Sequence, residues 1–410
     1  MQIFKKLQKA NKSFNLNDSI AGYNWLCLDI GTENMKARYI NTGLRFDEPS
    51  YVAEDYEKNR LYFGHEAKAL VGKTNENIII KRPVRDGNIA DPKSLEKIIA
   101  RIFNKFNLNT VQRRKLIVIM ATPSDINPVQ RIALESIVKK LGAYRGFIQE
   151  EVKMAVLGSG QDIFGTSIMC IDMGGGSTDI AIISKDSILY SLSSHCAGDY
   201  LTEKVQEYIV KTKNVRVGLK EAEDLKKAIG SLIPGKNEEL YRISGLLIPR
   251  NSSKSGEVLA ISKTIYISPE EIRTNVMQKE FRDHIIPAIR KVLRIAVEKA
   301  LGSIGDLKKV GKGVTICGGG AYIKGIDKFI QDELAKEYHL KEYDKKEKLV
   351  ADEVYEGDFF EVRCAKDPLY NVINGCMKYR DEIYREILQE QEHKDNLLFD
   401  DSSAFHKARR

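Results

Sequence analysis

The chain has 410 residues, of which 42% are hydrophobic and 30% charged, and its formal net charge is +8 at pH 7. This length exceeds one ordinary core and allows two or more domains. No apolar run approaches the roughly 18 to 20 residues of a membrane span, and no secretory signal is recognisable, so a cytoplasmic protein is expected.

The mild excess of positive charge permits an anionic partner but is typical of a solvated surface, and we do not expect nucleic acid as a partner. The six cysteines are scattered, without a C-x-x-C pair or a histidine at metal-ligand spacing. Reduced, mostly buried thiols are therefore expected rather than a metal centre.

The N-terminal segment, residues 1–20, begins with MQIFKKLQKANK. Its apolar residues fall near one face of a helix, namely Met1, Ile3, Phe4 and Leu7. Its lysines are available to anionic lipid headgroups, namely Lys5, Lys6, Lys9 and Lys12. This pattern is typical of an amphipathic helix that binds an anionic membrane surface. A disordered basic tail is the alternative, because short isolated helices are marginal in water.

Two segments share one pattern, in which an apolar strand ends in an aspartate, a glycine-containing turn follows, and a second strand begins. The first is WLCLDIGTENMKARYI, with Asp29, and the second is IDMGGGSTDIAII, with Asp172. They lie about one domain length apart, which predicts two duplicated halves. A third glycine cluster, at residues 318–320, follows a strand and precedes a helix.

Glycine turns of this kind are candidates for phosphate binding, because they direct consecutive N–H groups toward a concavity. Asp29 and Asp172 would repel phosphate unless a hydrated Mg²⁺ lay between, an arrangement that Mg²⁺ favours. Either hairpin alone could be an ordinary turn. The two together, with the third cluster, favour a phosphate site that is neither a P-loop nor a Rossmann turn, since residues 174–176 are consecutive glycines followed by a strand.

Six ordered blocks carry a resemblance to the bacterial actin family MreB, within the superfamily of actin, heat-shock chaperone and sugar kinase ATPases. The blocks are DEPSYVAED from Asp47, GHEAKALVGKTNENIIIKRPVRDGNIAD from Gly64, IQEEVKMAVLGSG from Ile148, AGDYLTEKVQEYI from Ala197, AEDLKKAIGSL from Ala222 and DPLYNVINGC from Asp367. The resemblance spans roughly residues 25–378. It implies an α/β, actin-like ATPase fold, with two duplicated RNase H-like halves around a nucleotide cleft and a small subdomain on each half.

The same resemblance implies domain boundaries. They are 21–45, 88–158 and 360–380 for subdomain IA, 46–87 for IB, 159–197 and 259–345 for IIA, and 198–258 for IIB. A charged insertion at 346–359 and a C-terminal helix and tail at 381–410 exceed the usual family length. Both are expected to be surface elaborations, with partner binding as the alternative.

The resemblance also implies a site for ATP or ADP with Mg²⁺. Asp29 and Asp172 would hold the metal through water, and Glu151, Ser177 and Asp172 would be the catalytic residues, with Glu151 positioning the attacking water. The expected nucleotide-binding residues are Gly31, Thr32, Asn34, Gly174, Gly175, Gly176, Ser177, Thr178, Glu223, Lys226, Gly318, Gly319 and Gly320. By spacing alone, Glu223 and Lys226 would be an ordinary surface ion pair on one helix face.

Two departures from the family pattern concern this site. Val152 stands where the family has proline, so the loop that aims Glu151 is expected to be less rigid. Glu33 stands in the first phosphate hairpin where the family has a small uncharged residue. Because Glu151, Asp172 and Ser177 are present, slow hydrolysis rather than none is expected.

The function implied by the resemblance is a slow ATPase that polymerises into membrane-associated, antiparallel double filaments and organises cell shape at the inner face of the cell membrane. Its expected partners are copies of itself, the anionic membrane, other MreB paralogues and membrane shape proteins. Some relatives contact the membrane through an apolar loop, for which Phe106 and Leu108 are candidates. The alternative function is a nucleotide-switched interaction module that neither polymerises nor turns over appreciably.

Overall fold

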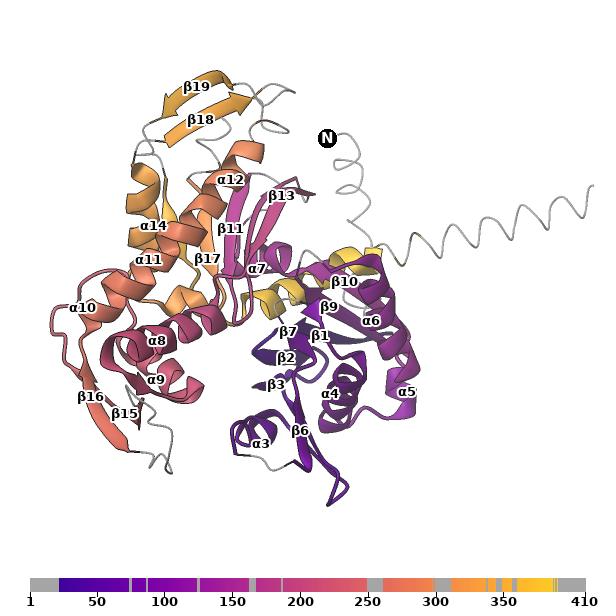
Figure 1. Cartoon of the computed structure of the whole chain (residues 1–410). Helices are drawn as coiled ribbons and strands as arrows, with labels where there is room; N and C mark the ends of the chain where they lie inside the picture. The colour runs from indigo at the N-terminus through magenta and orange to yellow at the C-terminus, as the bar shows by residue number, and fades with distance from the viewer. Residues whose placement is uncertain are drawn as a thin grey trace, which may run out of the picture.

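The computed structural model describes residues 22–385, except for 74–75, 86–87, 124–125, 162–166, 186, 249–260, 297, 299–309, 311, 337, 344–348 and 356–359, and also describes residues 387 and 389. The predicted membrane segment at 1–20 and most of the predicted C-terminal tail lie outside these residues. Figure 1 shows two lobes joined along one side, the first built from the N-terminal part of the chain and the second from the middle part, with the C-terminal helix (yellow) running from the junction onto the first lobe.

The first half is built on a five-stranded sheet with the order β10-β9-β1-β2-β3. Its strands are β1 (Asn24–Ile30), β2 (Asn34–Tyr39), β3 (Leu44–Pro49), β9 (Leu116–Thr122) and β10 (Arg145–Glu150). The first three strands are antiparallel neighbours, whereas β9 is parallel to both β1 and β10. Helices α4 (Pro92–Lys105) and α6 (Pro128–Lys140) pack on this sheet through one apolar cluster. Each helix begins with proline after a side-chain cap, Asp91 or Asn127.

The second half repeats this arrangement in a sheet with the order β13-β12-β11-β17-β20. Its strands are β11 (Ile168–Met173), β12 (Thr178–Ser184), β13 (Ser187–Ser194), β17 (Val314–Cys317) and β20 (Val362–Cys364). Here β11, β12 and β13 are antiparallel neighbours, whereas β17 is parallel to both β11 and β20. The repeat of strand order and direction confirms the predicted duplication and the predicted fold class.

Helices cover the second sheet through a larger apolar cluster. One helical run comprises α10 (Pro269–Ile272), α11 (Gln278–Glu280) and α12 (Ile286–Ala296), with π-helical turns at Arg273–Met277 and Phe281–Ile285 between them. Helix α14 (Ile326–Ala335) packs beside it. The backbone of β18 (Tyr338–Tyr343) and β19 (Leu349–Tyr355) forms a two-stranded sheet at the edge of this half, so the predicted charged insertion contains a strand.

Each half carries a smaller subdomain. In the first half it contains β4 (Val52–Asp55), β5 (Arg60–Phe63), β6 (Ile78–Lys81) and helix α3 (Gly64–Lys68), and the short pair β7 (Val84–Arg85) and β8 (Asn88–Ile89) follows it in sequence. Helix α5 (Thr110–Arg113) comes after α4 and belongs to the body of the first half, where Arg113 donates to the carbonyl oxygens of Leu108 and Leu141. In the second half it contains β14 (Val215–Arg216), β15 (Tyr241–Leu247), β16 (Ser262–Ile267), α8 (Gly198–Lys213) and α9 (Leu219–Ile229). In Figure 1 these subdomains lie at the lower ends of the two lobes, facing each other.

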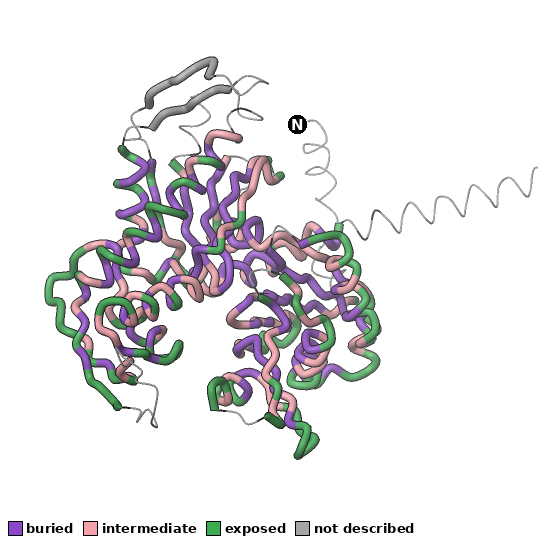
Figure 2. Tube along the Cα trace, in the orientation of Figure 1, coloured by how far each residue is buried: buried purple, intermediate pink, exposed green. Residues whose placement is uncertain are grey.

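Two helices cross where the halves meet, α7 (Glu151–Ser159) and the helix at residues 371–385. A Cβ added to Gly158 would lie 1.8 Å from the carbonyl oxygen of Asn371, and one added to Gly375 would lie 1.9 Å from that of Met154. The two backbones are therefore in direct contact, which only glycine permits. Residues of both sheets share an apolar cluster around this crossing, and buried residues continue from one lobe into the other there (Figure 2).

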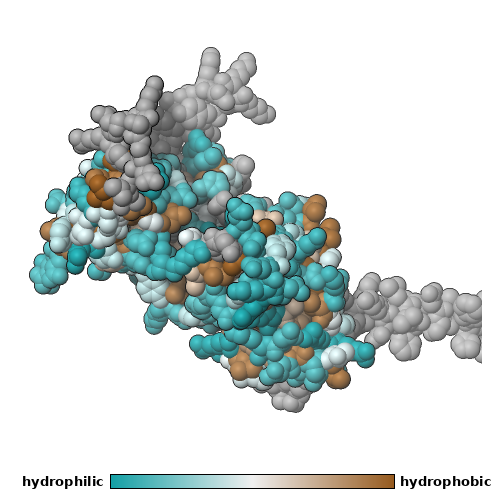
Figure 3. Space-filling model, turned by 60° about the horizontal axis from the view of Figure 1, so that its bottom comes forward, coloured by the Kyte–Doolittle hydropathy of each residue, from teal (hydrophilic) through white to brown (hydrophobic). Residues whose placement is uncertain are grey.

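The molecular surface is mainly polar on the face shown in Figure 3, where apolar side chains occur in small groups. Within the described part of the chain, we find no helix with the length and apolarity of a membrane span. The described cysteines, which include all six, are free thiols, as predicted.

Candidate functional site

A cavity of about 570 Å³ lies between the two halves, a size typical of sites for small molecules. It is lined by every predicted site residue but one: Asp29, Gly31, Thr32, Asn34, Glu151, Asp172, Gly174, Gly175, Gly176, Ser177, Glu223, Lys226, Gly318, Gly319 and Gly320. The exception is Thr178, whose hydroxyl donates to the carbonyl oxygen of Cys196 at 2.7 Å and so supports the second hairpin from behind.

The two glycine turns pack directly against each other at this cavity. A Cβ added to Gly176 would lie 2.6 Å from Cγ2 of Thr32, and one added to Gly175 would lie 2.8 Å from the Cβ of Glu33. At the third cluster, a Cβ on Gly320 would lie 2.3 Å from Cγ of Met173. These glycines are therefore required by contacts within the protein, in addition to any approach of a ligand.

Acidic side chains gather at the carboxyl ends of the central strands, which is where ligands bind in α/β sheets. Asp29, Asp172 and Asp179 are buried and, with Glu151, line the cavity. Burial, followed by the charges of Asp179 and Asp29, raises the pKa of Asp172 to about 7. Burial and the charges of Asp29, Asp172 and Asp179 hold the pKa of Glu151 well above its usual range. The cluster is therefore short of positive charge.

Lys36 forms an ion pair with one of these carboxylates, its Nζ lying 3.1 Å from Oδ2 of Asp29. Burial opposes its charged form, but the charge of Asp29 and the hydrogen bond to it, with help from Asp47 and Asp172, outweigh burial and raise the pKa of Lys36. Lys36 in turn favours the ionised forms of Asp172 and Glu151. It balances only part of the acidic charge in the cavity.

A hydrated Mg²⁺ fits this arrangement. Among the described residues, no group of three or more His, Cys, Asp or Glu side chains could hold a metal ion directly. Asp29 and Asp172 both line the cavity and could share a cation through its waters. That is the coordination Mg²⁺ prefers. Oε1 of Glu151 is shielded from solvent and has no hydrogen-bond partner, which leaves an acceptor available to a bound water.

Glu151 is positioned by the start of a helix rather than by a loop. Strand β10 ends at Glu150 and α7 begins at the next residue. Val152, where lower rigidity was expected, is fully buried in the first turn of α7. The structure therefore contains no loop at this position. The buried side chain of Val152, rather than a proline ring, restrains the backbone beside Glu151.

Sequence reasoning missed Lys36 and Asp179. Each lies directly opposite the aspartate of its own hairpin, Lys36 across from Asp29 and Asp179 across from Asp172. Oγ of Ser177 donates to Oδ2 of Asp179 at 3.0 Å, so Asp179 orients the predicted catalytic hydroxyl. Both residues could have been predicted from strand alternation, because residues paired across a hairpin point to the same face of the sheet.

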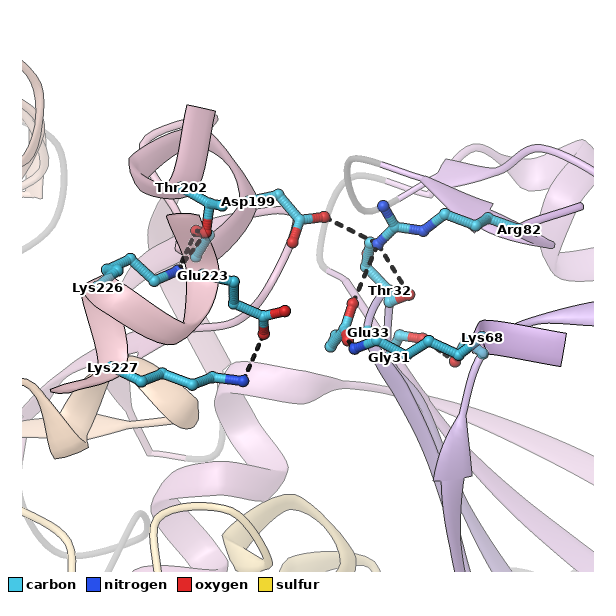
Figure 4. A network of polar contacts seen from close by, with 12 residues as sticks. Gly31, Thr32, Glu33, Lys68, Arg82, Asp199, Thr202, Glu223, Lys226 and Lys227 are labelled. Carbon is cyan, nitrogen blue, oxygen red and sulfur yellow. Dashed lines mark hydrogen bonds and ion pairs between the residues drawn. The ribbon is translucent and has the colours of Figure 1, made fainter. Parts of the chain in front are cut away.

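Glu223 and Lys226 do not pair with each other. Glu223 forms an ion pair with Lys227, whereas Nζ of Lys226 donates to Oγ1 of Thr202 at 2.7 Å and to the carbonyl oxygen of Gly198 (Figure 4). Burial lowers the pKa of Lys226 despite nearby Glu223 and Asp199. The simple surface ion pair that spacing suggested is therefore wrong, and both side chains line the cavity.

Two duplicated halves with glycine turns facing a shared cavity define an actin-like protein. The fold matches that of MamK in its double helical filament, with a TM-score of 0.67 over 88% of this chain and 99% of that chain at 16% sequence identity, which bears on the fold alone.

The model of the MreB/Mbl protein family matches residues 23–351, and the chain belongs to this family. The cell shape-determining protein Mbl of Bacillus cereus is 32% identical over 309 residues, which cover 75% of this chain and 88% of that protein. The crystal structure of MreB5 of Spiroplasma citri bound to AMPPNP aligns with a TM-score of 0.76 at 32% identity, covering 90% of this chain and 99% of that chain. The chain is therefore an actin-like member of a cell shape-determining, cytoskeletal family.

Proposed function

We propose that this protein binds ATP and ADP with Mg²⁺ in the cavity and hydrolyses ATP slowly. The observation that carries the proposal is the unpartnered, shielded Oε1 of Glu151 in a cavity that two glycine turns line from opposite halves. The related MreB5 of Spiroplasma citri has been crystallised with AMPPNP and with ADP, which supports nucleotide binding by this chain.

In this proposal each element of the cavity has one task. The turns at residues 31–34 and 174–177 cradle the phosphates through their N–H groups, while Glu223, Lys226 and the glycines at 318–320 contact the nucleoside. Asp29 and Asp172 would hold Mg²⁺ through its waters, and the bound metal would supply positive charge beside the phosphates. Glu151 accepts a hydrogen bond from the attacking water, and Ser177, oriented by Asp179, helps to hold that water.

The experiment that tests this function is a titration of the purified full-length chain with a fluorescent ATP analogue, with and without Mg²⁺, followed by measurement of steady-state phosphate release. We expect saturable binding that Mg²⁺ strengthens and slow release of phosphate. Absence of binding at millimolar analogue would overturn the proposal.

We propose further that the protein polymerises into antiparallel double filaments. Beyond family membership, the support is an apolar pair on α6, where Val129 is 75% exposed and Ile132 is 65% exposed. These residues lie three apart and so share one helix face. The two protofilaments of an antiparallel double filament are related by two-fold symmetry, so the same surface of each copy contacts its partner. An exposed apolar pair is suited to such a contact, because it can pack against the same pair on a second copy.

Replacing Val129 with glutamate is expected to prevent filament pairing, because the contact between copies would then bury two unpaired carboxylates. High-speed sedimentation with Mg-ATP, Mg-ADP and no nucleotide should show a nucleotide-dependent pellet for the wild-type chain and a much smaller one for Val129→Glu. The exposed Leu240→Glu serves as a control and should pellet normally. If the wild-type chain binds ATP but never pellets, the nucleotide-switched module replaces the filament as the function.

We place the filaments in the cytoplasm at the inner face of the membrane, held there by residues 1–20. Deleting residues 1–12 is expected to abolish co-flotation with liposomes that contain anionic lipid, since the four lysines and the apolar face are lost together. Binding of the wild-type chain should weaken as salt is added. If the deletion variant co-floated as well as the wild-type chain, membrane binding would have to come from another part of the chain. Phe106 and Leu108, the other candidates, are buried, which disfavours them.

A further inference from the structure

Arg82 connects the two halves at the edge of the cavity. It lies between β6 and β7 in the first half, and its Nη2 is 2.8 Å from Oδ2 of Asp199 at the start of α8 in the second half. The same nitrogen is 3.5 Å from Oε2 of Glu33 and 3.4 Å from the carbonyl oxygen of Thr32, both in the first glycine turn. Figure 4 shows the contacts from Asp199, Glu33 and Thr32 meeting at the guanidinium of Arg82.

A second cation joins this group from the small subdomain of the first half. Lys68, at the end of α3, forms an ion pair with the carboxylate of Glu33. Both cations lie over the ring of the buried Tyr51, with Cζ of Arg82 5.2 Å and Nζ of Lys68 5.9 Å from its centroid. The aromatic face holds the two side chains in place beside Glu33.

Asp199 is attached in turn to the second glycine turn. Its backbone N–H donates to the carbonyl oxygen of Gly175 at 2.7 Å, and the N–H of Gly198 donates to that of Gly174 at 3.1 Å. Arg82 therefore contacts the first turn directly and the second turn through Asp199. Any separation of the halves that parts the two turns must break the ion pair between Arg82 and Asp199.

We propose that Glu33, Lys68, Arg82 and Asp199 form an ionic latch that holds the halves together over the phosphate end of the cavity and slows the release of bound nucleotide. The inference rests on the proposed function, because it places a nucleotide in the cavity. It also gives a role to Glu33, whose charge would otherwise repel phosphate and is instead balanced by two cations. Arg82 and Lys68 act as positioning residues, since neither lines the cavity.

The expected effect is modest and sensitive to salt. The side chain of Arg82 is 21% exposed and that of Asp199 is 37% exposed, so water and ions screen their attraction. An ion pair of this kind supports a change of about two- to fivefold in a rate that depends on breaking it.

The test measures how fast the full-length chain releases a non-hydrolysable fluorescent ATP analogue with Mg²⁺ when excess unlabelled ATP is added, at a protein concentration below assembly. We expect Arg82→Gln to release the analogue about two- to fivefold faster than the wild-type chain. Asp199→Asn should also speed release, and the double variant should be no faster than Arg82→Gln alone, because Arg82→Gln already removes the contact that Asp199→Asn removes. Arg82→Lys, which keeps the charge, should restore part of the slow release.

The salt dependence of the release rate is a second readout, because a merely structural role of Arg82 would not make release depend on salt. Raising the salt concentration should speed release from the wild-type chain and leave Arg82→Gln nearly unchanged. The matched control is Arg85→Gln, an exposed arginine on β7, which should release the analogue at the wild-type rate.

Release from Arg82→Gln at the wild-type rate, or additive effects in the double variant, would overturn the latch while leaving the proposed function intact. Failure of the wild-type chain to bind the analogue would instead overturn the proposed function, and the latch with it.

Discussion

Replacing Glu151 with glutamine is expected to lower steady-state phosphate release by about 100-fold or more, the range typical of losing a positioned acid or base group. Glutamine preserves the size of the side chain but removes the carboxylate that would accept a hydrogen bond from the attacking water. Affinity for the ATP analogue should change little, because glutamine keeps the size of the side chain and the other acidic residues of the cavity, Asp29, Asp172 and Asp179, remain.

Glu150→Gln is the matched control for this substitution. Glu150 is adjacent in sequence but outside the cavity lining, and its carboxylate lies 3.3 Å from Nη2 of Arg131 on α6. It should retain phosphate release within a few fold of wild type. If Glu151→Gln released phosphate as fast as Glu150→Gln, the catalytic role of Glu151 would be wrong, whatever the nucleotide affinity.

Replacing Gly375 with alanine is expected to destabilise the protein by about 3 kcal/mol or more, the upper part of the range for overpacked sites. The added Cβ would lie 1.9 Å from the carbonyl oxygen of Met154 and 2.8 Å from its Cα, so α7 and the helix at 371–385 must move apart. In an ordinary helix interior the same change would stabilise by about 1 kcal/mol. The steric conflict therefore opposes the intrinsic preference and is expected to exceed it.

Thermal unfolding followed by circular dichroism measures this effect, with Gly313→Ala as the control. A Cβ at Gly313 would meet no atom closer than 3.8 Å, so its unfolding temperature should stay near that of the wild-type chain. Because α7 begins at Glu151, a shift of this helix should also reduce phosphate release. An unfolding temperature for Gly375→Ala equal to that of the control would show that the crossing adapts without cost.

Local pattern was sufficient for much of the site. The aspartates at strand ends, the glycine turns and the apolar strands around them were all recognisable, because a strand that ends in a turn leaves a short-range signature. The structure confirms the duplicated halves and brings all the predicted site residues except Thr178 to one cavity. Lys36 and Asp179 escaped notice, although each faces an aspartate across a hairpin whose register the turn determines.

Contacts between distant segments could not be predicted in this way. Glu223 forms its ion pair with Lys227 and not with Lys226, because Lys226 donates its hydrogen bonds to Thr202 and Gly198 on the neighbouring helix α8. Glu33 was noticed only as a departure from the family pattern, and its partners Lys68 and Arg82 lie far along the chain. No periodicity relates such residues, since they meet only when sheets and helices pack.

The sequence by itself determined the elements of this protein: two hairpins with aspartates and glycine turns, the capped helices, and a chain long enough for two halves. Strand alternation, capping and turn chemistry depend on residues a few positions apart, so they can be recognised in the sequence itself. Only the tertiary structure decided how the halves meet, through the helix crossing at Gly158 and Gly375 and the ion pair of Arg82 with Asp199. It also decided that the carboxylates around Glu151 gather in one cavity with too little positive charge to balance them. Those features depend on burial and on distances between segments remote in sequence, and such distances exist only once the core has formed.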